Sequence, residues 1–200
     1  MTVLVTGGAG YIGSHVARLL AQRGEAVVIA DDLSTGIPSR LEGTAHATLD
    51  LAAVDAVQSI RAIIRAHDVT SVIHLAARKK VGESVELPEW YYSQNIGGMA
   101  NLLEAMKAEG VNRLVFSSSA ATYGMPDVDF VGEDFNCKPI NPYGASKMMS
   151  EQMIRDLSFA SNLKHVILRY FNVAGALKAQ RGWLAERHNP ETHLIPNVLR

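Results

Sequence analysis

The sequence predicts an α/β protein built on a doubly wound parallel sheet of the Rossmann type, with helices on both faces. Short, uninterrupted apolar runs of strand length alternate along the 200 residues with longer stretches in which apolar residues recur at helical spacing. Strands that are apolar throughout, rather than at every second residue, are typical of a parallel sheet buried on both faces. A glycine cluster between the first strand and the first helix indicates the same fold.

Six segments are expected to form the sheet. The first is a β-rich run that stops at the glycine cluster, and the second, AVVIA, stops at two consecutive aspartates. The fourth and fifth are short apolar runs typical of buried strands. In chain order the six segments are residues 2–6, 26–30, 45–49, 71–75, 113–117 and 164–170.

Four helices are expected between these strands. The first covers 11–23 and has Gly24 as its C-cap, and its periodic apolar residues are Ile12, Val16, Leu19 and Leu20. The second covers 52–66, with one apolar face formed by Val54, Val57, Ile60, Ile63 and Ile64. A long third helix is expected over about 89–109. Asn141 as N-cap and Pro142 as first helical residue begin the fourth.

The composition is that of an ordinary globular chain and excludes several classes of protein. Of its residues, 48% are hydrophobic and 20% are charged, and 19 basic residues are balanced by 20 acidic ones. This balance leaves no excess of positive charge for a nucleic acid or an anionic membrane surface. The single Cys137 excludes a disulfide framework and a CxxC zinc site. Without a leader-like N-terminus or an apolar run near the ~20 residues of a membrane span, we expect a cytoplasmic protein.

The glycine cluster has the spacing of a dinucleotide-binding loop. Two registers fit, Gly8-x-Gly10-x-x-Gly13 and Gly7-x-x-Gly10-x-x-Gly13. Either register provides a tight turn and a backbone that can approach a pyrophosphate. The helix that follows would direct free N–H groups and the positive end of its dipole at the phosphates.

Acidic residues after the second and third strands extend this motif. Asp31 lies 18 residues past Gly13, where a carboxylate can accept hydrogen bonds from an adenosine ribose. Because no arginine adjoins Asp31 to hold a 2′-phosphate, the sequence favours NAD over NADP as the cofactor. Asp32 is interpreted first as a turn residue. Asp50 is open to two interpretations, since it can cap the following helix or reach the adenine amino group.

A second group of polar residues lies near the fourth helix. Tyr143 and Lys147 are four residues apart, which places both side chains on one helical face. An ammonium beside a phenol, together with the helix N-terminus, is expected to lower the pKa of Tyr143 towards neutrality. Such a phenolate is a general base for a sugar or alcohol hydroxyl. Ser119 follows the fifth strand, at the edge of the sheet where ligands bind, and its hydroxyl can share the proton or hold the reacting oxygen.

Taken together, these motifs resemble the extended short-chain dehydrogenase/reductase superfamily, and most closely its UDP-glucose (UDP-galactose) 4-epimerases. The resemblance covers nearly the whole chain, with several motifs in order. The matching segments are residues 5–15 (VTGGAGYIGSH), 31–34 (DDLS), 72–77 (VIHLAA), 81–85 (VGESV), 116–120 (FSSSA), 123–124 (YG), 141–147 (NPYGASK), 168–176 (LRYFNVAGA) and 188–196 (HNPETHLIP).

The resemblance implies a role for each matching residue. The implied binding residues for NAD are Gly7, Gly10, Tyr11, Ile12, Gly13, Asp31, Asp32, Asp50, Leu51, Leu75, Ala76, Ala77, Lys79, Asn95, Tyr143, Lys147 and Tyr170. The implied catalytic set is Ser119, Tyr143 and Lys147. For a UDP-sugar, the implied binding residues are Lys79, Ser119, Tyr143, Asn172, His193 and Leu194.

The implied activity is the interconversion of UDP-glucose and UDP-galactose. It would proceed by hydride abstraction at sugar C4, rotation of the 4-keto intermediate and return of hydride to the opposite face. Related dehydratases carry Asp-Glu after the residue that matches Ser119, whereas this chain has Ala120 and Ala121, which disfavours elimination of water. Two alternatives stay open: a non-catalytic NAD-binding module, and another nucleotide-sugar epimerase or reductase that uses the same residues.

The resemblance also implies a homodimer formed through the helices at 89–109 and 142–159. Neither a nucleic acid nor a membrane is an expected partner. No metal is expected, because His188 and His193, five residues apart with Glu191 between them, match no standard zinc spacing. His74, at the end of a strand, is interpreted as a packed, hydrogen-bonded histidine.

A change of composition after Gly175 marks a predicted domain boundary. Residues 178–189 are polar and irregular, and the apolar segment near the end of the chain has no following element to bury it. We therefore expect an NAD-binding Rossmann domain at residues 1–175 and the beginning of a substrate-binding region at 176–200. The remainder of that region is expected to lie outside these residues, as in a C-terminally truncated epimerase.

Overall fold

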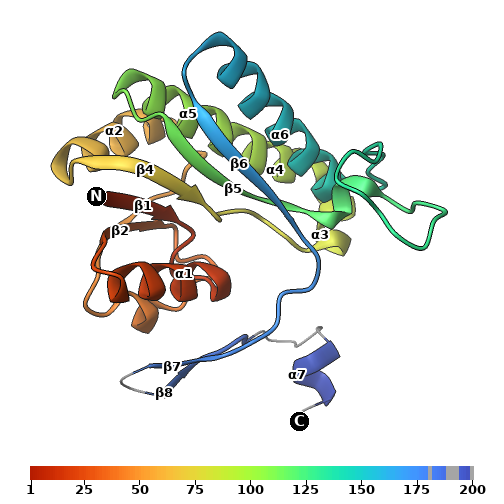
Figure 1. The fold of residues 1–200 in the computed structure, drawn as a ribbon, viewed down its shortest axis with the longest axis horizontal. Coiled ribbons are helices and arrows are strands. Elements are labelled where there is room, and N and C mark those ends of the chain that lie inside the picture. Colours follow the sequence, from red (N-terminus) through yellow and green to blue (C-terminus); the bar gives the residue numbers. More distant parts are fainter. Residues whose placement is uncertain (180–181, 188–193, 199–200) are drawn as a thin grey trace.

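The computed structural model describes residues 1–179, 182–187 and 194–198 of the chain. Its centre is a six-stranded parallel sheet, as Figure 1 shows. In chain order the strands are β1 (Thr2–Thr6), β2 (Ala26–Asp31), β3 (Ala45–Thr48), β4 (Val69–His74), β5 (Arg113–Ser119) and β6 (Lys164–Tyr170). The predicted Rossmann-type sheet is confirmed, and each strand begins and ends within two residues of its expected bounds.

The strand order determines where a ligand can bind. Along the sheet the order is β3-β2-β1-β4-β5-β6, and every neighbouring pair is parallel. From β1 the chain winds outwards through β2 and β3, and it then crosses to the other side of β1 to add β4, β5 and β6. The winding direction therefore changes between β1 and β4, where sheets of this kind have a crevice at the carboxyl ends of the strands.

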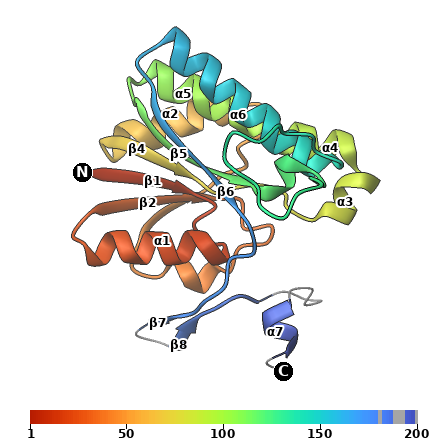
Figure 2. The same ribbon diagram turned by 45° about the vertical axis from the view of Figure 1, so that its right-hand side comes forward.

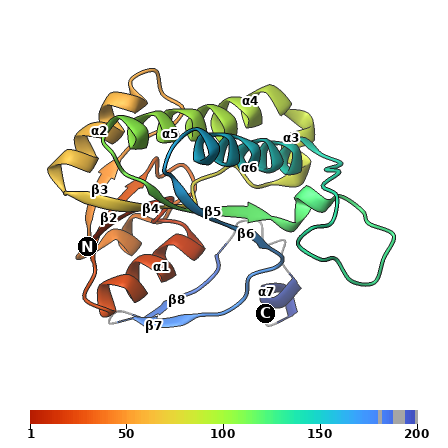
Figure 3. The same ribbon diagram turned by 45° about the horizontal axis from the view of Figure 1, so that its top comes forward.

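Helices cover both faces of the sheet. The helices are α1 (Tyr11–Gln22), α2 (Ala56–Ala66), α3 (Val81–Glu86), α4 (Pro88–Tyr92), α5 (Gly98–Ala108) and α6 (Pro142–Ala160). Figure 3 shows α1 on one side of the sheet and α2, α5 and α6 on the other. Val3 and Val5 of β1 pack on the α1 side, whereas Leu4 packs with the opposite layer. Burial on both faces explains why the strands are apolar throughout.

Helix α2 begins at Ala56, four residues later than expected. Residues 51–55 precede it as turns, and the Asp50 carboxylate closes the first of these by accepting a hydrogen bond from the Ala52 N–H at 2.8 Å. The expectation that Val54 lies on the buried face was wrong, because Val54 is fully exposed in this turn segment. Ile60 is buried as expected, since helical spacing holds from Ala56 onwards.

The long helical stretch expected over about 89–109 is confirmed, because the chain is helical without a break from Pro88 to Ala108, but it contains a π-helical turn that was not expected. Helix α4 ends at Tyr92, a π-helical turn covers Ser93–Gly97, and α5 begins at Gly98. Short π-helical insertions within α-helical segments are frequent at functional sites. This one carries Asn95, which is 6% exposed and faces the site described below.

Helix α6 begins as expected. The side-chain oxygen of Asn141 accepts a hydrogen bond from the Gly144 N–H at 2.8 Å, and Pro142 is the first helical residue. This cap fixes the first turn of the helix, on which Tyr143 lies.

Beyond β6 the chain forms an antiparallel hairpin, β7 (Leu177–Ala179) and β8 (Gly182–Leu184), and a short helix, α7 (Leu194–Val198). Figure 2 shows the hairpin beside α1, on the side of the molecule away from α5 and α6. The domain boundary expected after Gly175 stays a prediction. Within the described parts of the chain, no helix is both long enough and apolar enough to cross a membrane.

The observed start of α2 predicts different effects for two truncations of similar size. Ile60→Ala leaves a cavity in the core between α2 and α5, and should lower the free energy of unfolding by about 2–5 kcal/mol. Val54→Ala removes a fully exposed side chain and should change it by less than about 0.5 kcal/mol. Urea denaturation followed by circular dichroism measures both. Equal losses would show that Val54 is packed and would contradict the observed start.

Candidate active site

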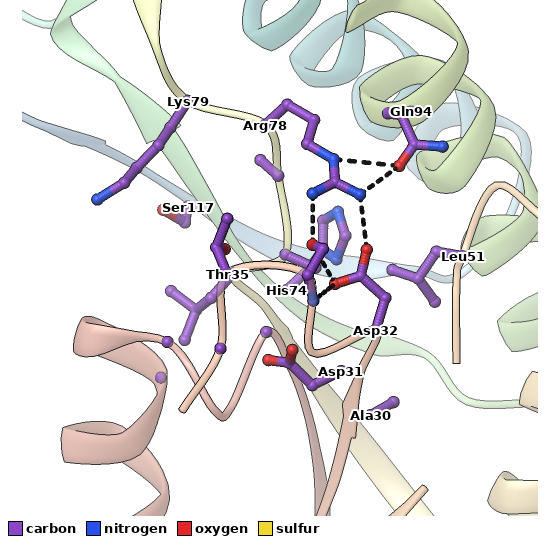
Figure 4. Close-up of a pocket in the computed structure, with 18 of the residues that line it drawn as sticks. Ala30, Asp31, Asp32, Thr35, Leu51, His74, Arg78, Lys79, Gln94 and Ser117 are labelled. Atoms are coloured by element: carbon purple, nitrogen blue, oxygen red, sulfur yellow. Dashed lines mark hydrogen bonds and ion pairs between the residues drawn. The ribbon is translucent and has the colours of Figure 1, made fainter. Parts of the chain in front are cut away.

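A pocket lies at the carboxyl ends of β1, β2 and β4, where the winding direction of the sheet changes (Figure 4). It brings together residues from the glycine loop, from the ends of the strands and from the π-helical turn. The residues singled out in the sequence that line it are Gly7, Gly10, Tyr11, Ile12, Gly13, Asp31, Asp32, Asp50, Leu51, Leu75, Ala76, Ala77, Lys79 and Asn95.

Several glycines of the loop leave no room for a side chain. A Cβ atom on Gly7, whose φ is +73°, would lie 2.6 Å from the backbone nitrogen of Ala76, and one on Gly13 would lie 2.1 Å from the Gly7 carbonyl oxygen. Gly7, Gly10 and Gly13 line the pocket, whereas Gly8 packs against Ile29 of β2. The structure therefore decides between the two registers in favour of Gly7-x-x-Gly10-x-x-Gly13.

The N-terminus of α1 supplies hydrogen-bond donors to the pocket. The first residues of the helix, from Tyr11 to Gly13, line it, and the intrahelical ladder begins with the Ser14 N–H, which donates to the Gly10 carbonyl at 3.1 Å. The N–H groups before this point have no partner within the helix, and the helix dipole is positive at this end. A glycine cradle of this kind fits the pyrophosphate of a dinucleotide.

Asp31 lies at the end of β2 and is only 8% exposed. Its two carboxylate oxygens accept hydrogen bonds from the backbone N–H groups of Ala9 and Leu33, each at 2.9 Å. Burial raises the pKa of Asp31 above its ordinary value, and the two N–H groups oppose this shift. A carboxylate has about four acceptor positions, so Asp31 can still accept hydrogen bonds from the two hydroxyls of a ribose.

Arg78, which follows β4, is a pocket residue that the sequence interpretation missed. Its guanidinium donates a hydrogen bond to Asp32 at 2.7 Å, and others to Ser34 and to Gln94 (Figure 4). An arginine thus lies beside the acidic pair at the end of β2, although none adjoins it in the sequence. The available signal was topological: Arg78 follows the strand that neighbours β1 across the switch, so it must reach the same crevice.

Asn95 ties this segment to α6. Its amide oxygen accepts a hydrogen bond from the Arg78 N–H at 2.8 Å, and its amide nitrogen donates to the Arg78 carbonyl and to the Ser146 hydroxyl, both at 3.0 Å. The π-helical turn therefore fixes the chain after β4 against the helix that carries Tyr143 and Lys147.

The predicted catalytic residues meet at the carboxyl end of β5. The Ser119 hydroxyl accepts a hydrogen bond from the Ala121 N–H at 3.1 Å, and it lies close enough to the Tyr143 hydroxyl to affect the pKa of Tyr143. The Lys147 ammonium donates to the Ser117 carbonyl oxygen at 2.7 Å. Ser117 lines the pocket, whereas Ser119, Tyr143 and Lys147 are not among the residues that line it.

Burial controls the protonation of this set. It lowers the pKa of Lys147 to about 7, against the opposing charge of Glu151. It raises the pKa of Tyr143 above its ordinary value, although the hydrogen bond from Ser119 opposes the shift. The expectation of a Tyr143 pKa lowered towards neutrality was therefore wrong for the chain on its own. The pKa of Tyr143 is raised because desolvation favours the neutral phenol. The Lys147 ammonium, which was expected to lower this pKa, is bound to the Ser117 carbonyl instead.

Glu151, one turn beyond Lys147, was also missed and is completely buried. It accepts hydrogen bonds from the Ser118 hydroxyl at 2.5 Å, from Arg155 at 2.8 Å and from Arg169 at 2.7 and 2.9 Å. Burial raises the pKa of Glu151, but these donors outweigh burial and hold it below its ordinary value. The signal available in the sequence was the spacing alone, since Glu151 lies four residues after Lys147 and therefore on the same helical face.

Other predicted residues lie further from the pocket. Tyr170 ends β6 opposite Ser119, and burial raises its pKa. Asn172 is exposed beyond β6. Leu194 begins α7, whereas His193 lies outside the described residues. The segment after β6 is tied back to the glycine loop by Tyr11, whose hydroxyl donates to a carbonyl oxygen, that of Gly175, at 2.6 Å.

His74 is packed and hydrogen-bonded, as expected. It is 3% exposed, its Nδ1 lies 2.7 Å from the Thr6 hydroxyl, and its ring stacks on Phe116. Burial lowers the pKa of His74 to about 3, so the ring is neutral. Among the described residues no cluster of His, Cys, Asp and Glu could hold a metal ion, and the segment with His188 and His193 lies outside them.

Comparisons with known proteins agree with this geometry. A model of the NAD dependent epimerase/dehydratase family matches residues 3–200. Over 200 residues the chain is 45% identical to a UDP-glucose 4-epimerase of Lactobacillus helveticus, and the match covers 100% of this chain and 59% of that protein.

Solved structures give the same result. A UDP-glucose 4-epimerase of Brucella ovis in complex with NAD is 43% identical with a TM-score of 0.91, over 98% of this chain and 59% of that one. A UDP-glucose 4-epimerase of Bifidobacterium longum in complex with NAD+ and UDP is 35% identical with a TM-score of 0.84, over 89% of this chain and 55% of that one. The chain thus spans less than two thirds of the length of these relatives. On its sequence and on its fold, it belongs to the NAD dependent epimerase/dehydratase family.

Proposed function

We propose that this protein is an NAD-dependent UDP-glucose 4-epimerase, which interconverts UDP-glucose and UDP-galactose. One observation carries the proposal: Ser119, Tyr143 and Lys147 lie together at the carboxyl end of β5, beside Ser117 of a pocket in which Gly7 and Gly13 have no room for a side chain. The relatives described above support it, since they bear this name and two were solved with NAD. When bound, NAD would accept hydride from the sugar C4 and return it.

The pocket residues have complementary tasks towards NAD in this proposal. Gly7, Gly10 and Gly13 would hold the pyrophosphate against the N-terminus of α1. Asp31 would bind the adenosine ribose through its remaining acceptor positions. Asp50, whose side chain closes the turn before α2, and Leu51 also line the pocket and would lie at its adenine end.

Tyr143 would take the proton of the sugar 4-hydroxyl, with the Ser119 hydroxyl holding the same oxygen. A phenol with a raised pKa is a poor base, so its ionisation needs a positive charge nearby. Lys147 lies one helical turn away and would supply that charge in its protonated form, which the charge of Glu151 favours although burial lowers the pKa of Lys147 to about 7. In the reverse direction Tyr143 would return the proton to the 4-keto sugar.

The UDP-sugar and the oligomeric state belong to the same proposal. Lys79 at the pocket, with Asn172, His193 and Leu194 further along the chain, would bind the UDP-sugar. A homodimer would form through the helices at 89–109 and 142–159. Exposed apolar side chains on α6, Met149 and Phe159, support such a contact, as does the balanced charge of the chain. A cytoplasmic location is proposed with it.

Tyr143→Phe tests the proposal directly. The full-length variant should retain NAD but convert UDP-galactose to UDP-glucose at least about 100-fold more slowly, because a general base contributes roughly 10²–10⁴-fold. Chromatography of the nucleotide sugars and absorbance of NADH at 340 nm measure both. Conversion by the wild type without net NADH supports an epimerase. A stoichiometric change in NADH indicates a reductase, and neither change indicates a binding module. Near-normal turnover of the variant would remove Tyr143 from catalysis.

Asp31→Ala tests the cofactor site separately. Removal of a hydrogen-bonding carboxylate should weaken NAD binding about tenfold or more, measured by isothermal titration calorimetry. Asp129→Ala is the matched control, since Asp129 is exposed in the loop before α6 and removes the same charge. Equal affinities of the two variants for NAD would show that Asp31 does not bind the ribose.

The lowered pKa of Lys147 predicts a pH dependence of stability. Between about pH 7 and 10.5 the folded chain binds fewer protons at Lys147 than the unfolded chain, so the free energy of unfolding should rise with pH across this window. Lys147→Met should remove this contribution. Urea denaturation at several pH values measures it for both proteins. An identical pH slope in the two proteins would contradict the shift.

A further inference from the structure

Two adjacent aspartates at the end of β2 point in different directions. The Asp31 carboxylate accepts hydrogen bonds from the backbone N–H groups of Ala9 and Leu33, on the side of the glycine loop. Asp32 instead faces across the mouth of the pocket, where its Oδ2 lies 2.7 Å from the guanidinium of Arg78 (Figure 4). The two carboxylates therefore have separate partners, although they are neighbours in the chain.

Arg78 is held firmly at this position. Its guanidinium donates to Asp32, Ser34 and Gln94 and lies 4.8 Å from the centroid of the Trp90 ring, and 16% of its side chain is exposed. The other oxygen of Asp32 accepts the N–H and the hydroxyl of Ser34 at 3.0 and 2.6 Å. Burial raises the pKa of Asp32, but Ser34 and Arg78 outweigh burial, so the carboxylate is ionised at neutral pH.

The position of this pair bears on one chemical difference between two cofactors. NADP carries a phosphate on the 2′-hydroxyl of its adenosine ribose, where NAD has only the hydroxyl, and arginine is the usual partner of that phosphate. Asp31, Asp32, Ser34 and Arg78 all line the same pocket. An incoming 2′-phosphate would be repelled by the negative charge of Asp32. It would also find the Arg78 guanidinium already bound to Asp32, Ser34 and Gln94.

We propose that Asp32 determines cofactor specificity by holding Arg78 in this ion pair, so that the pocket accepts the unsubstituted ribose of NAD and rejects the 2′-phosphate of NADP. The inference rests on the proposed NAD site and deepens it. Asp31 acts directly, through hydrogen bonds to the ribose. Asp32 acts indirectly, since it repels a phosphate and withholds from it the guanidinium that would neutralise it.

The test compares the affinities of NAD⁺ and NADP⁺ for Asp32→Asn. Asparagine keeps an oxygen that can accept the hydrogen bonds of Ser34, but it removes the negative charge and releases Arg78. The preference for NAD⁺, expressed as the ratio of the two Kd values from calorimetry, should fall at least about tenfold. Titrations with 5′-ADP and 2′,5′-ADP should show the same change, which would attribute it to the 2′-phosphate alone.

Two further variants show whether Arg78 is responsible. In Asp32→Asn combined with Arg78→Gln, the gain in NADP⁺ affinity should disappear, because the guanidinium that would bind the phosphate is gone. Asp129→Asn makes the same change of net charge in an exposed loop and should leave the ratio as in the wild type.

A ratio that stays the same in Asp32→Asn, while NAD⁺ still binds, would overturn the inference and leave the proposed function intact. A gain that persists without Arg78 would also overturn it. A wild-type protein that binds neither cofactor would overturn the proposed NAD site and this inference with it.

Discussion

The close contact between the glycine loop and the chain after β4 is the constraint on which the rest of the structure depends. A Cβ on Gly7 would lie 2.6 Å from the Ala76 nitrogen, while the Gly7 N–H donates to the Ala30 carbonyl of β2 at 2.8 Å. The loop is therefore held between the two strands that flank β1. Only at this distance can α1 begin against the carboxyl ends of the strands, with its N–H groups facing the pocket. The packing of the sheet and the shape of the pocket therefore both depend on the absence of a side chain at Gly7.

The distribution of charge in the pocket matches the parts of the dinucleotide in the proposed site. The end proposed for the phosphates has a helix N-terminus and glycine backbone, which favour anions. The end proposed for the ribose has Asp31 and Asp32, which favour hydroxyl donors and repel anions. Arg78 would upset this division if its charge were free, but Asp32 lies 2.7 Å from it. The pocket therefore keeps a positive end and a negative end although a guanidinium crosses its mouth.

Most of the fold could be predicted from the sequence because it depends on local signals. The apolar strands, the cap formed by Asn141 and the spacing of the glycines each lie within a short segment, and each was confirmed. Apart from the local turn that delays the start of α2, the interpretation was wrong or incomplete where distant contacts decide. Arg78 reaches Asp32 across 46 residues. The hydrogen bonds of Glu151 are completed by Arg169, which lies in the following strand, β6. The pKa of Tyr143 likewise depends on burial, which cannot be predicted from the spacing of Tyr143 and Lys147.

The buried cluster around Glu151 explains how the proposed catalytic residues keep their positions. An isolated carboxylate without exposure would be strongly destabilising, but Glu151 accepts hydrogen bonds from β5, from α6 and from Arg169 of β6. These bonds fix α6 against the ends of two strands, and Lys147 lies one turn before Glu151 on the same helix. The same negative charge opposes the loss of the Lys147 proton that burial would otherwise cause. One carboxylate thus helps to position the lysine and favours its charged form, both of which the chemistry proposed for Tyr143 requires.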